Sequence, residues 1–153
     1  MTTVKDIYKL LADFAPVKYK EDFDNVGLLV GDGEQNVSKV LVALDVTLEV
    51  AKEAERIGAE LIVAHHPVFF SVKSVTEDDP TGRLVRYLIR ANISAISMHT
   101  NLDKTNGGVN DMLAAALPAL EWANLDMDFL DALAELYPTC EAFYLQKELA
   151  AVL

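Results

Sequence analysis

The sequence contains little cysteine, glycine or proline, and it has no long hydrophobic run. Its one cysteine, Cys140, cannot form an internal disulfide, whereas a secreted domain of this size usually carries an even set, so we expect a cytoplasmic protein. Only 7 glycines and 5 prolines occur among 153 residues, and 52% of the residues are hydrophobic, which excludes collagen-like, low-complexity and disordered chains. No apolar run approaches the roughly 20 residues of a membrane span, and charges interrupt the N-terminal apolar pattern, so neither membrane association nor a signal peptide is expected.

Basic residues are also scarce. The 13 Lys and Arg residues stand against 24 Asp and Glu residues, which gives a formal net charge of −11. A field of this sign repels nucleic-acid phosphates and anionic lipids unless a local basic patch overrides it. Arg83, Arg86 and Arg90 have helical spacing and are most simply the solvent face of a helix. Nucleic acid is therefore not an expected partner.

Local signals predict an alternation of strands and helices. Helix starts are indicated by side chains that can accept backbone N–H groups, and one helix end is indicated by a glycine. These signals are Thr3 with Asp6, Thr47, Gly58, and Asp79 with Pro80. The predicted elements are a helix to Phe14, strands over Val26–Val30 and Lys39–Leu44, a helix from Thr47 to Ile57, a strand over Leu61–Ala64, a helix from Asp79 to about Ala91, a strand over Ile93–Met98, and a helix from about Val109 to Leu117.

This order of elements predicts an α/β fold with a β-α-β-α-β core. Strands without strict polar alternation, separated by helices, are typical of a largely parallel sheet that helices cover on both faces. Beyond Pro118 the chain is acidic and biased toward helix. We therefore expect an α/β domain over residues 1–117 and a helical C-terminal tail over residues 118–153.

The ionisable residues that could carry chemistry follow successive strands. The three histidines, His65, His66 and His99, come directly after two of the predicted strands. Asp45 follows the strand before them, and Asp103 follows His99 by four residues. Because ligands bind in open α/β sheets at the carboxyl ends of the strands, these five residues are candidates for one site.

The adjacent pair His65 and His66 is the strongest of these signals. Pro67 restricts His66 to an extended backbone, in which neighbouring side chains diverge, so we expect the two imidazoles to serve two neighbouring ions rather than one. With Asp103 they supply the ligand types of Zn, Mn, Fe, Co or Ni sites. The alternative is that both histidines bond to loop carbonyls at the end of a buried strand.

Four further features are either ambiguous or have a simple local explanation. His99 is expected to be a base or a partner of a ligand rather than a ligand, and Asp45 either poises a metal-bound water or caps a helix. Asp24-Asn25 is interpreted as a turn. Gly107-Gly108 could let a substrate phosphate approach a helix N-terminus, but such glycines more often only permit a tight turn.

Six short motifs occur in order along the chain. They are Asp24-Asn25-Val26-Gly27, Ala43-Leu44-Asp45-Val46-Thr47, His65-His66-Pro67, Asp79-Pro80-Thr81-Gly82-Arg83, His99-Thr100-Asn101-Leu102-Asp103 and Gly107-Gly108-Val109-Asn110-Asp111. Together they resemble the Nif-three-like family of dinuclear metal centre proteins, whose members are commonly named GTP cyclohydrolase 1 type 2 homologues. The resemblance covers the chain from its start to about Leu117.

The resemblance implies a dinuclear metal centre on an α/β scaffold and subunits assembled into a ring, often a homohexamer. Carried across by position, His66 and Asp103 bind one ion and His65 binds the other. The family pattern also uses a histidine and a bridging glutamate from a second, C-terminal half. No histidine follows His99, so the chain is similar to the N-terminal half of the family only, and we expect one ion or none.

The function expected from these features is metal-dependent hydrolysis of a small molecule, such as a nucleotide or another phosphoester. In such sites, paired ions about 3.5–4 Å apart lower the pKa of a water and orient the substrate. His65, His66 and Asp103 are the expected metal ligands, and His99 and Asp45 are the expected catalytic groups. The alternative is a non-enzymatic metal-binding or protein-interaction module that acts as a homo-oligomer.

Overall fold

The computed structural model describes residues 1–116, so the predicted helical tail over residues 118–153 lies outside the described part. The chain divides into two compact units, Met1–Val109 and a second unit that begins at Asn110. The first unit contains the sheet and every candidate site residue. The helix α5 (Val109–Ala116) begins where the first unit ends. The proposed division at residue 117 stays a prediction.

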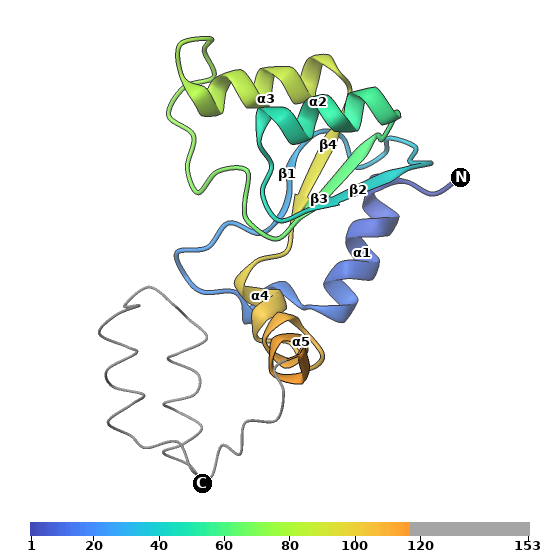
Figure 1. The fold of residues 1–153 in the computed structure, drawn as a ribbon, viewed down its shortest axis with the longest axis vertical. Coiled ribbons are helices and arrows are strands. Elements are labelled where there is room, and N and C mark those ends of the chain that lie inside the picture. Colours follow the sequence, from blue (N-terminus) through green and yellow to red (C-terminus); the bar gives the residue numbers. More distant parts are fainter. Residues whose placement is uncertain (117–153) are drawn as a thin grey trace, which may run out of the picture. The chain divides into compact units, whose positions relative to one another are not determined.

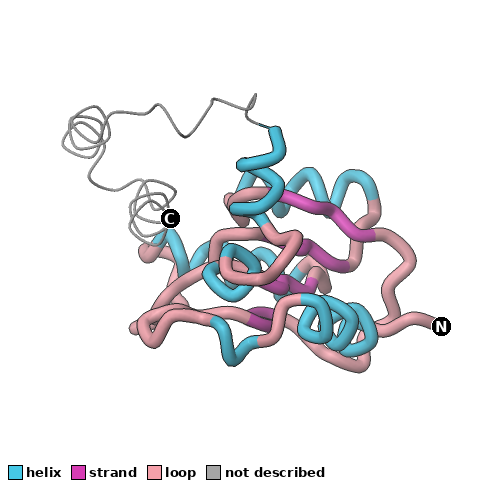
Figure 2. The backbone as a smooth tube through the Cα atoms, turned by 90° about the horizontal axis from the view of Figure 1, so that it is seen from below, coloured by secondary structure: helices cyan, strands magenta, loops and turns pink. Residues whose placement is uncertain are grey.

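A four-stranded sheet forms the centre of the first unit, with the strand order β1-β4-β3-β2. Three strands are parallel to one another, namely β2 (Val40–Ala43), β3 (Leu61–Ala64) and β4 (Ser94–Ser97). The fourth strand, β1 (Gly27–Val30), pairs with β4 in the antiparallel direction at the opposite edge from β2. The largely parallel sheet predicted from the sequence is therefore confirmed, and Figure 2 shows its strands in one layer.

Helices cover both faces of the sheet (Figure 1). On one face lie α2 (Leu48–Ile57) and α3 (Pro80–Arg90), which cross between the parallel strands. On the other face lies α1 (Val4–Phe14). Each parallel strand is followed by a helix, so its carboxyl end is also the point where a loop leaves the sheet.

Alternate residues of the central strands supply the two hydrophobic cores. Ile62 and Ala95 point toward α2 and α3 and are fully buried with Leu88 of α3. Leu61 and Ile96 point to the opposite face and are fully buried under α1. Because β3 and β4 are buried on both faces, they are held rigidly on both sides, and the loops that follow them start from a fixed frame.

The helix boundaries are set by the caps that the sequence predicts. Thr3 and Asp6 form a capping box at the start of α1. The side chains of Thr47 and Asp79 accept N–H groups at the starts of α2 and α3, and Gly58 ends α2 in the left-handed conformation at φ 69°. All of these cap predictions are confirmed.

Two short helical segments were not predicted, η1 (Val17–Tyr19) and α4 (Thr100–Asp103). Both segments are too short to show the apolar periodicity by which a helix is recognised in a sequence. The segment α4 matters for function, because it starts directly after His99 and carries Asp103 at its end. Within residues 1–116, no helix is long and apolar enough to cross a membrane.

Candidate metal centre

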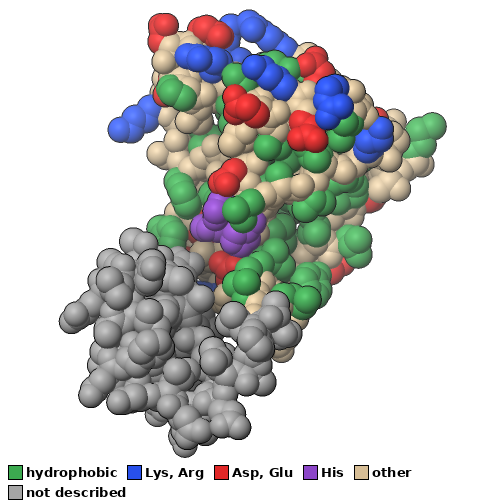
Figure 3. All heavy atoms as spheres, in the orientation of Figure 1, with side chains coloured by type: hydrophobic (Ala, Val, Ile, Leu, Met, Phe, Trp, Pro, Cys, Tyr) green, Lys and Arg blue, Asp and Glu red, His purple; other side chains and the backbone are tan. Residues whose placement is uncertain are grey.

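The three histidines lie together beside the carboxyl ends of β3 and β4. Each of His65, His66 and His99 offers a ring nitrogen, and these three nitrogens lie within 4.8 Å of one another. The ring centroids are 5.1 Å apart for His65–His66 and His65–His99, and 5.5 Å apart for His66–His99. Figure 3 shows the histidine side chains gathered in one place with acidic side chains on either side. The sequence therefore identified three groups that the fold brings together.

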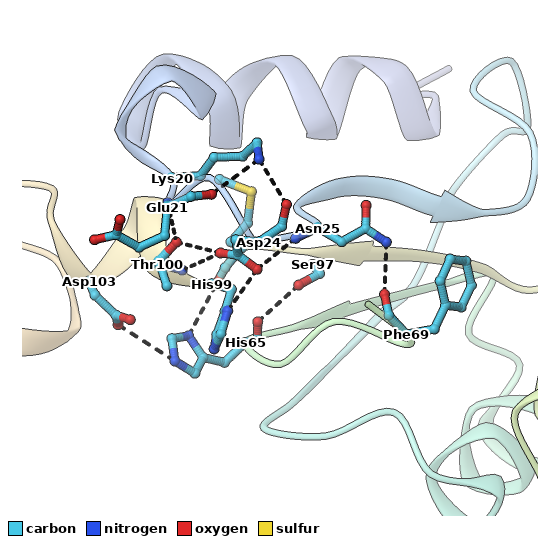
Figure 4. A network of polar contacts seen from close by, with 11 residues as sticks. Lys20, Glu21, Asp24, Asn25, His65, Phe69, Ser97, His99, Thr100 and Asp103 are labelled. Carbon is cyan, nitrogen blue, oxygen red and sulfur yellow. Dashed lines mark hydrogen bonds and ion pairs between the residues drawn. The ribbon is translucent and has the colours of Figure 1, made fainter. Parts of the chain in front are cut away.

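His65 is held between a backbone carbonyl and a carboxylate. Its Nδ1 donates to the carbonyl of Met98 at 3.0 Å, since a carbonyl oxygen can only accept. Its Nε2 lies 3.5 Å from Oδ1 of Asp103. Ser97 Oγ donates to the His65 carbonyl at 3.0 Å, which ties the residue to the end of β4 (Figure 4). Neutral His65 thus carries its lone pair on Nε2, on the side of Asp103.

His66 has a carboxylate partner of its own. Its Nδ1 lies 2.7 Å from Oδ1 of Asp45, the residue that follows β2 by two positions. The helix cap that Asp45 might have supplied comes instead from Thr47, whose side chain accepts the N–H of Val50. Of the two interpretations offered for Asp45, the structure therefore excludes the cap and places the carboxylate against the imidazole.

The expectation that His65 and His66 diverge is wrong. It assumed a regular strand, in which successive N–H groups point to opposite sides. Past Ala64 both N–H groups point to the same side: His65 donates to the carbonyl of Ala43 at 3.3 Å and His66 to that of Leu44 at 2.9 Å. The chain bends there, and both rings turn toward His99.

His99 packs against Asp24, a residue 75 positions earlier in the chain. Nδ1 of His99 lies 2.9 Å from Oδ1 of Asp24, whose side chain is completely buried. Thr100 donates its N–H to Oδ2 of Asp24 at 3.0 Å and also donates its hydroxyl proton to that oxygen. Asn25 donates its N–H to Oδ1 at 2.7 Å.

Asp24 is thus an ionised carboxylate inside the protein. Burial raises the pKa of Asp24, but the hydrogen bonds from Thr100, His99 and Asn25 outweigh burial and hold the pKa below its usual value of 3.8. The interpretation of Asp24 as a turn residue missed this role. No local signal could have revealed it, because the partner lies on another element far along the chain.

Asn25 has a long-range contact as well. Its side-chain amide donates to the carbonyl of Phe69 at 2.7 Å, in the loop that follows the two adjacent histidines. The neighbouring Phe70 ring lies 6.0 Å from His99 and 6.4 Å from Phe23, both distances measured between centroids. Phe23 and Phe70 are 65% and 57% exposed, so their rings form an exposed apolar surface beside the histidines.

The glycine pair of the sixth motif is explained by a turn. Gly107 has a φ of 74°, which favours glycine. A Cβ on Gly108 would lie 1.9 Å from the Leu102 carbonyl oxygen, so no larger residue fits there. Its N–H donates to the Thr105 carbonyl at 2.8 Å, which closes the turn after α4. These requirements account for both glycines without a bound phosphate.

The donor set fits a divalent transition metal. For each histidine, Nδ1 faces an oxygen acceptor, namely Met98 O, Asp45 Oδ1 or Asp24 Oδ1. This arrangement fixes the tautomer and leaves the Nε2 lone pair for a ligand, as in the carboxylate–histidine–metal groups of metalloproteins. Imidazole together with carboxylate suits Zn, Mn, Fe, Co and Ni. In the described part of the chain the site is a cluster of histidine and aspartate that could hold a metal ion.

The chain matches a known protein family over most of its length. The family model described as Duf34/NIF3 (NGG1p interacting factor 3) matches residues 2–150. A Clostridium perfringens protein named GTP cyclohydrolase 1 type 2 homolog is 50% identical over 115 residues, covering 74% of this chain and 44% of the relative. A Bacillus subtilis protein of the same name is 38% identical over 145 residues, covering 94% of this chain and 38% of the relative.

Solved structures show the same fold. The crystal structure of a Bacillus cereus protein related to NIF3 matches with a TM-score of 0.72 at 38% identity, covering 76% of this chain and 32% of that chain. A Staphylococcus aureus protein matches with a TM-score of 0.71 at 44% identity, covering 74% and 33%. The chain therefore spans less than half the length of these relatives. The family match runs to residue 150, past the limit near Leu117 that the six motifs indicated.

Proposed function

The chain belongs to the Duf34/NIF3 family, and from that premise we propose that it binds a divalent transition metal and catalyses metal-assisted hydrolysis. One observation carries the proposal: three imidazoles from two strand ends offer nitrogens within 4.8 Å of one another, next to the carboxylate of Asp103. A packed histidine core would bury these rings, yet the His66 side chain is 43% exposed and remains accessible.

His65, His66 and Asp103 are the proposed ligands. The Asp103 carboxylate lies against Nε2 of His65 in the structure, whereas the family resemblance pairs it with His66. Both assignments use the same three residues and differ only in which imidazole shares an ion with the carboxylate. A bound ion would lower the pKa of a coordinated water and polarise the substrate.

Asp45 and His99 are the proposed acid–base groups. Asp45 is 55% exposed at its side chain, so it can exchange protons with solvent while it orients His66. His99 is nearly enclosed, with 13% of its side chain exposed, and its ring lies beside both other histidines. It can accept a proton within the site, where solvent has little access.

The substrate class proposed is a nucleotide or another phosphoester. The relatives from Clostridium perfringens and Bacillus subtilis are both named GTP cyclohydrolase 1 type 2 homolog. In this chain the exposed rings of Phe23 and Phe70, tilted by 47° to each other, offer apolar aromatic surface beside the histidines, on which a planar ring can stack next to the reacting group.

A second candidate is a metal-binding module without catalysis. It is favoured by one observation: within the described residues the cluster offers three imidazoles and the carboxylate of Asp103, a donor set sufficient for one ion but small for two. A site with fewer ligands holds its metal more weakly. Either candidate is expected to act in the cytoplasm as a homo-oligomer. Sedimentation velocity on the purified chain would measure the oligomeric state.

The deciding experiment is elemental analysis of the untagged, full-length chain. Two equivalents of transition metal would support the dinuclear enzyme, and one equivalent or fewer would support the partial site. His66→Ala should lose metal, while Asp78→Ala, which removes an exposed carboxylate of the loop before α3, should retain it. Equal metal in wild type and His66→Ala would show that the ligand assignment is wrong.

Hydrolysis separates the enzyme from the binding module. Metal-loaded protein should release product from a panel of nucleotides and phosphoesters, and the rate should fall to background in Asp103→Asn. Metal binding without turnover of any compound would favour the second candidate.

A further inference from the structure

Asp24 is the most deeply buried charged group in the first unit that the proposed hydrolysis does not use. Its side chain is not exposed at all, and it sits in the loop before β1, behind the His99 ring (Figure 4). Lys20 donates to its backbone carbonyl at 2.8 Å, which leaves the carboxylate to other partners.

The direction of each hydrogen bond around Asp24 can be assigned. Oδ2 accepts the backbone N–H of Thr100 at 3.0 Å, and a backbone N–H can only donate. The Thr100 hydroxyl accepts the N–H of Glu21 at 2.9 Å, so its own proton is available for Oδ2. Oδ1 accepts the N–H of Asn25 at 2.7 Å. Every assigned partner donates, so the carboxylate acts as an acceptor throughout.

The same reasoning fixes the proton on His99. Nδ1 of His99 lies 2.9 Å from Oδ1, and an acceptor-only oxygen at this distance requires a proton on Nδ1. A neutral imidazole then carries its lone pair on Nε2. A histidine without such a partner could carry the proton on either nitrogen, and in half of those states its lone pair would face the wrong way.

We propose that Asp24 is the positioning residue of this site: it accepts a hydrogen bond from Nδ1–H of His99, keeps the proton on that nitrogen and thereby presents the Nε2 lone pair to the metal centre. This inference rests on the proposed function for its purpose, but the tautomer itself exists without metal. It also explains why the buried carboxylate contacts a histidine ring, whereas Lys20 binds the backbone carbonyl of the same residue.

The test is the tautomeric state of His99 in the metal-free, full-length chain. Long-range ¹H–¹⁵N correlation spectra of ¹⁵N-labelled protein, recorded at mildly alkaline pH after removal of metal by a chelator, distinguish Nδ1–H from Nε2–H. Wild type should show His99 with its proton on Nδ1. A wild-type His99 with its proton on Nε2 would overturn the proposal without any variant.

Asp24→Asn is the informative variant, because it keeps the shape of the side chain. Its NH₂ group should replace Oδ1, where it opposes only the backbone N–H of Asn25, rather than Oδ2, where it opposes both the backbone N–H and the hydroxyl of Thr100. An NH₂ there donates to Nδ1, so the ratio of Nε2–H to Nδ1–H at His99 should rise roughly tenfold or more, the ratio equivalent to one charge-assisted hydrogen bond. An unchanged ratio in folded Asp24→Asn would count against the proposal.

Asp45→Asn is the matched control. It makes the same chemical change beside His66, whose Nδ1 lies 2.7 Å from Asp45, and it should leave the His99 tautomer as in wild type. Addition of Zn²⁺ to the wild-type sample then tests the metal site separately. If no histidine signal moves, the proposed function fails while the assignment of Asp24 stands. If the metal binds but His99 has the wrong tautomer, only the assignment of Asp24 fails.

Discussion

Single atoms decide what each side chain of the metal centre can do. His65, His66 and His99 are the same residue type, but each has a different acceptor at Nδ1: a carbonyl, an exposed carboxylate and a buried carboxylate. The buried carboxylate cannot move without breaking several bonds, whereas the exposed one can exchange with water. His66 is therefore the imidazole whose orientation depends most on a single partner, Asp45.

This dependence predicts the effect of Asp45→Ala. Loss of the oxygen 2.7 Å from Nδ1 frees the His66 ring to rotate, and removal of such outer partners costs about 10–100-fold in metal affinity. Competition with a chromophoric chelator measures the Zn²⁺ dissociation constant. Asp78→Ala is the matched control, and an equal affinity in both variants would show that Asp45 does not orient a ligand.

Gly31 gives a residue-scale prediction about stability. Its φ is 111°, and a Cβ there would lie 2.1 Å from Ser94 Oγ and 2.7 Å from Ser94 Cα. Gly31→Ala should combine backbone strain with overpacking and lower the free energy of unfolding by about 2–5 kcal/mol. Gly58→Ala is the matched control, because its φ is 69° with nothing within 4 Å, so it should cost only about 1–2 kcal/mol.

Urea denaturation with a constant m-value measures both glycine variants. Two equal losses of stability would mean that the contact with Ser94 relaxes, and that only the left-handed backbone matters.

At the scale of the elements, the capping box of α1 predicts a pH dependence. The backbone N–H of Thr3 donates to the Asp6 carboxylate at 2.9 Å, and this bond, with that of the Thr3 hydroxyl, lowers the pKa of Asp6 below 3.8. A carboxyl with a lower pKa in the folded state stabilises the fold above its unfolded value, and this contribution is lost as the pH falls through the folded pKa.

Thr3→Ala should cost about 1 kcal/mol at neutral pH. Asp6→Ala should also be less stable than wild type at neutral pH, and the difference should shrink as the pH falls below 3.8 because the wild-type carboxylate becomes protonated. Denaturant titrations at a series of pH values measure this. A difference that stays constant down to the lowest pH would mean that the charge of Asp6 does not contribute.

The elements that could be predicted from sequence are those with local causes. Thr47, Asp79 and Gly58 each act within one turn of their helix, and each was placed correctly. The position of β1 next to β4 could not be predicted, because it depends on contacts between strands about 65 residues apart rather than on either strand's own pattern. The strand ends carrying the histidines were identified because the apolar runs before them are short and sharply bounded.

The site itself was predicted in part. The three histidines and Asp103 were selected because they follow strands, and the parallel sheet brings them together. Asp24 was missed because an Asp-Asn pair is ordinary turn chemistry, and nothing near it indicates a partner 75 residues away. The side-by-side rings of His65 and His66 were missed because the bend after β3 depends on the carbonyls of Ala43 and Leu44, which belong to a different part of the chain.

At the scale of the whole molecule, the metal centre and the fold depend on each other. The candidate ligands follow β3 and β4, and their partners come from the loop before β1 and from the segment after β2. An unfolded chain does not hold these segments together, so a metal ion that binds the site must favour the folded state.

We therefore expect Zn²⁺ to raise the free energy of unfolding, by about 2.7 kcal/mol when free metal is at 100 times its dissociation constant. A chelator should reverse the gain. In the double variant His65→Ala/His66→Ala the gain should disappear, whereas Asp78→Ala should retain it. Urea denaturation with and without Zn²⁺ measures each case. The double variant lacks the two imidazoles on which the site depends. If Zn²⁺ stabilises this variant as strongly as wild type, the ion binds elsewhere on the chain.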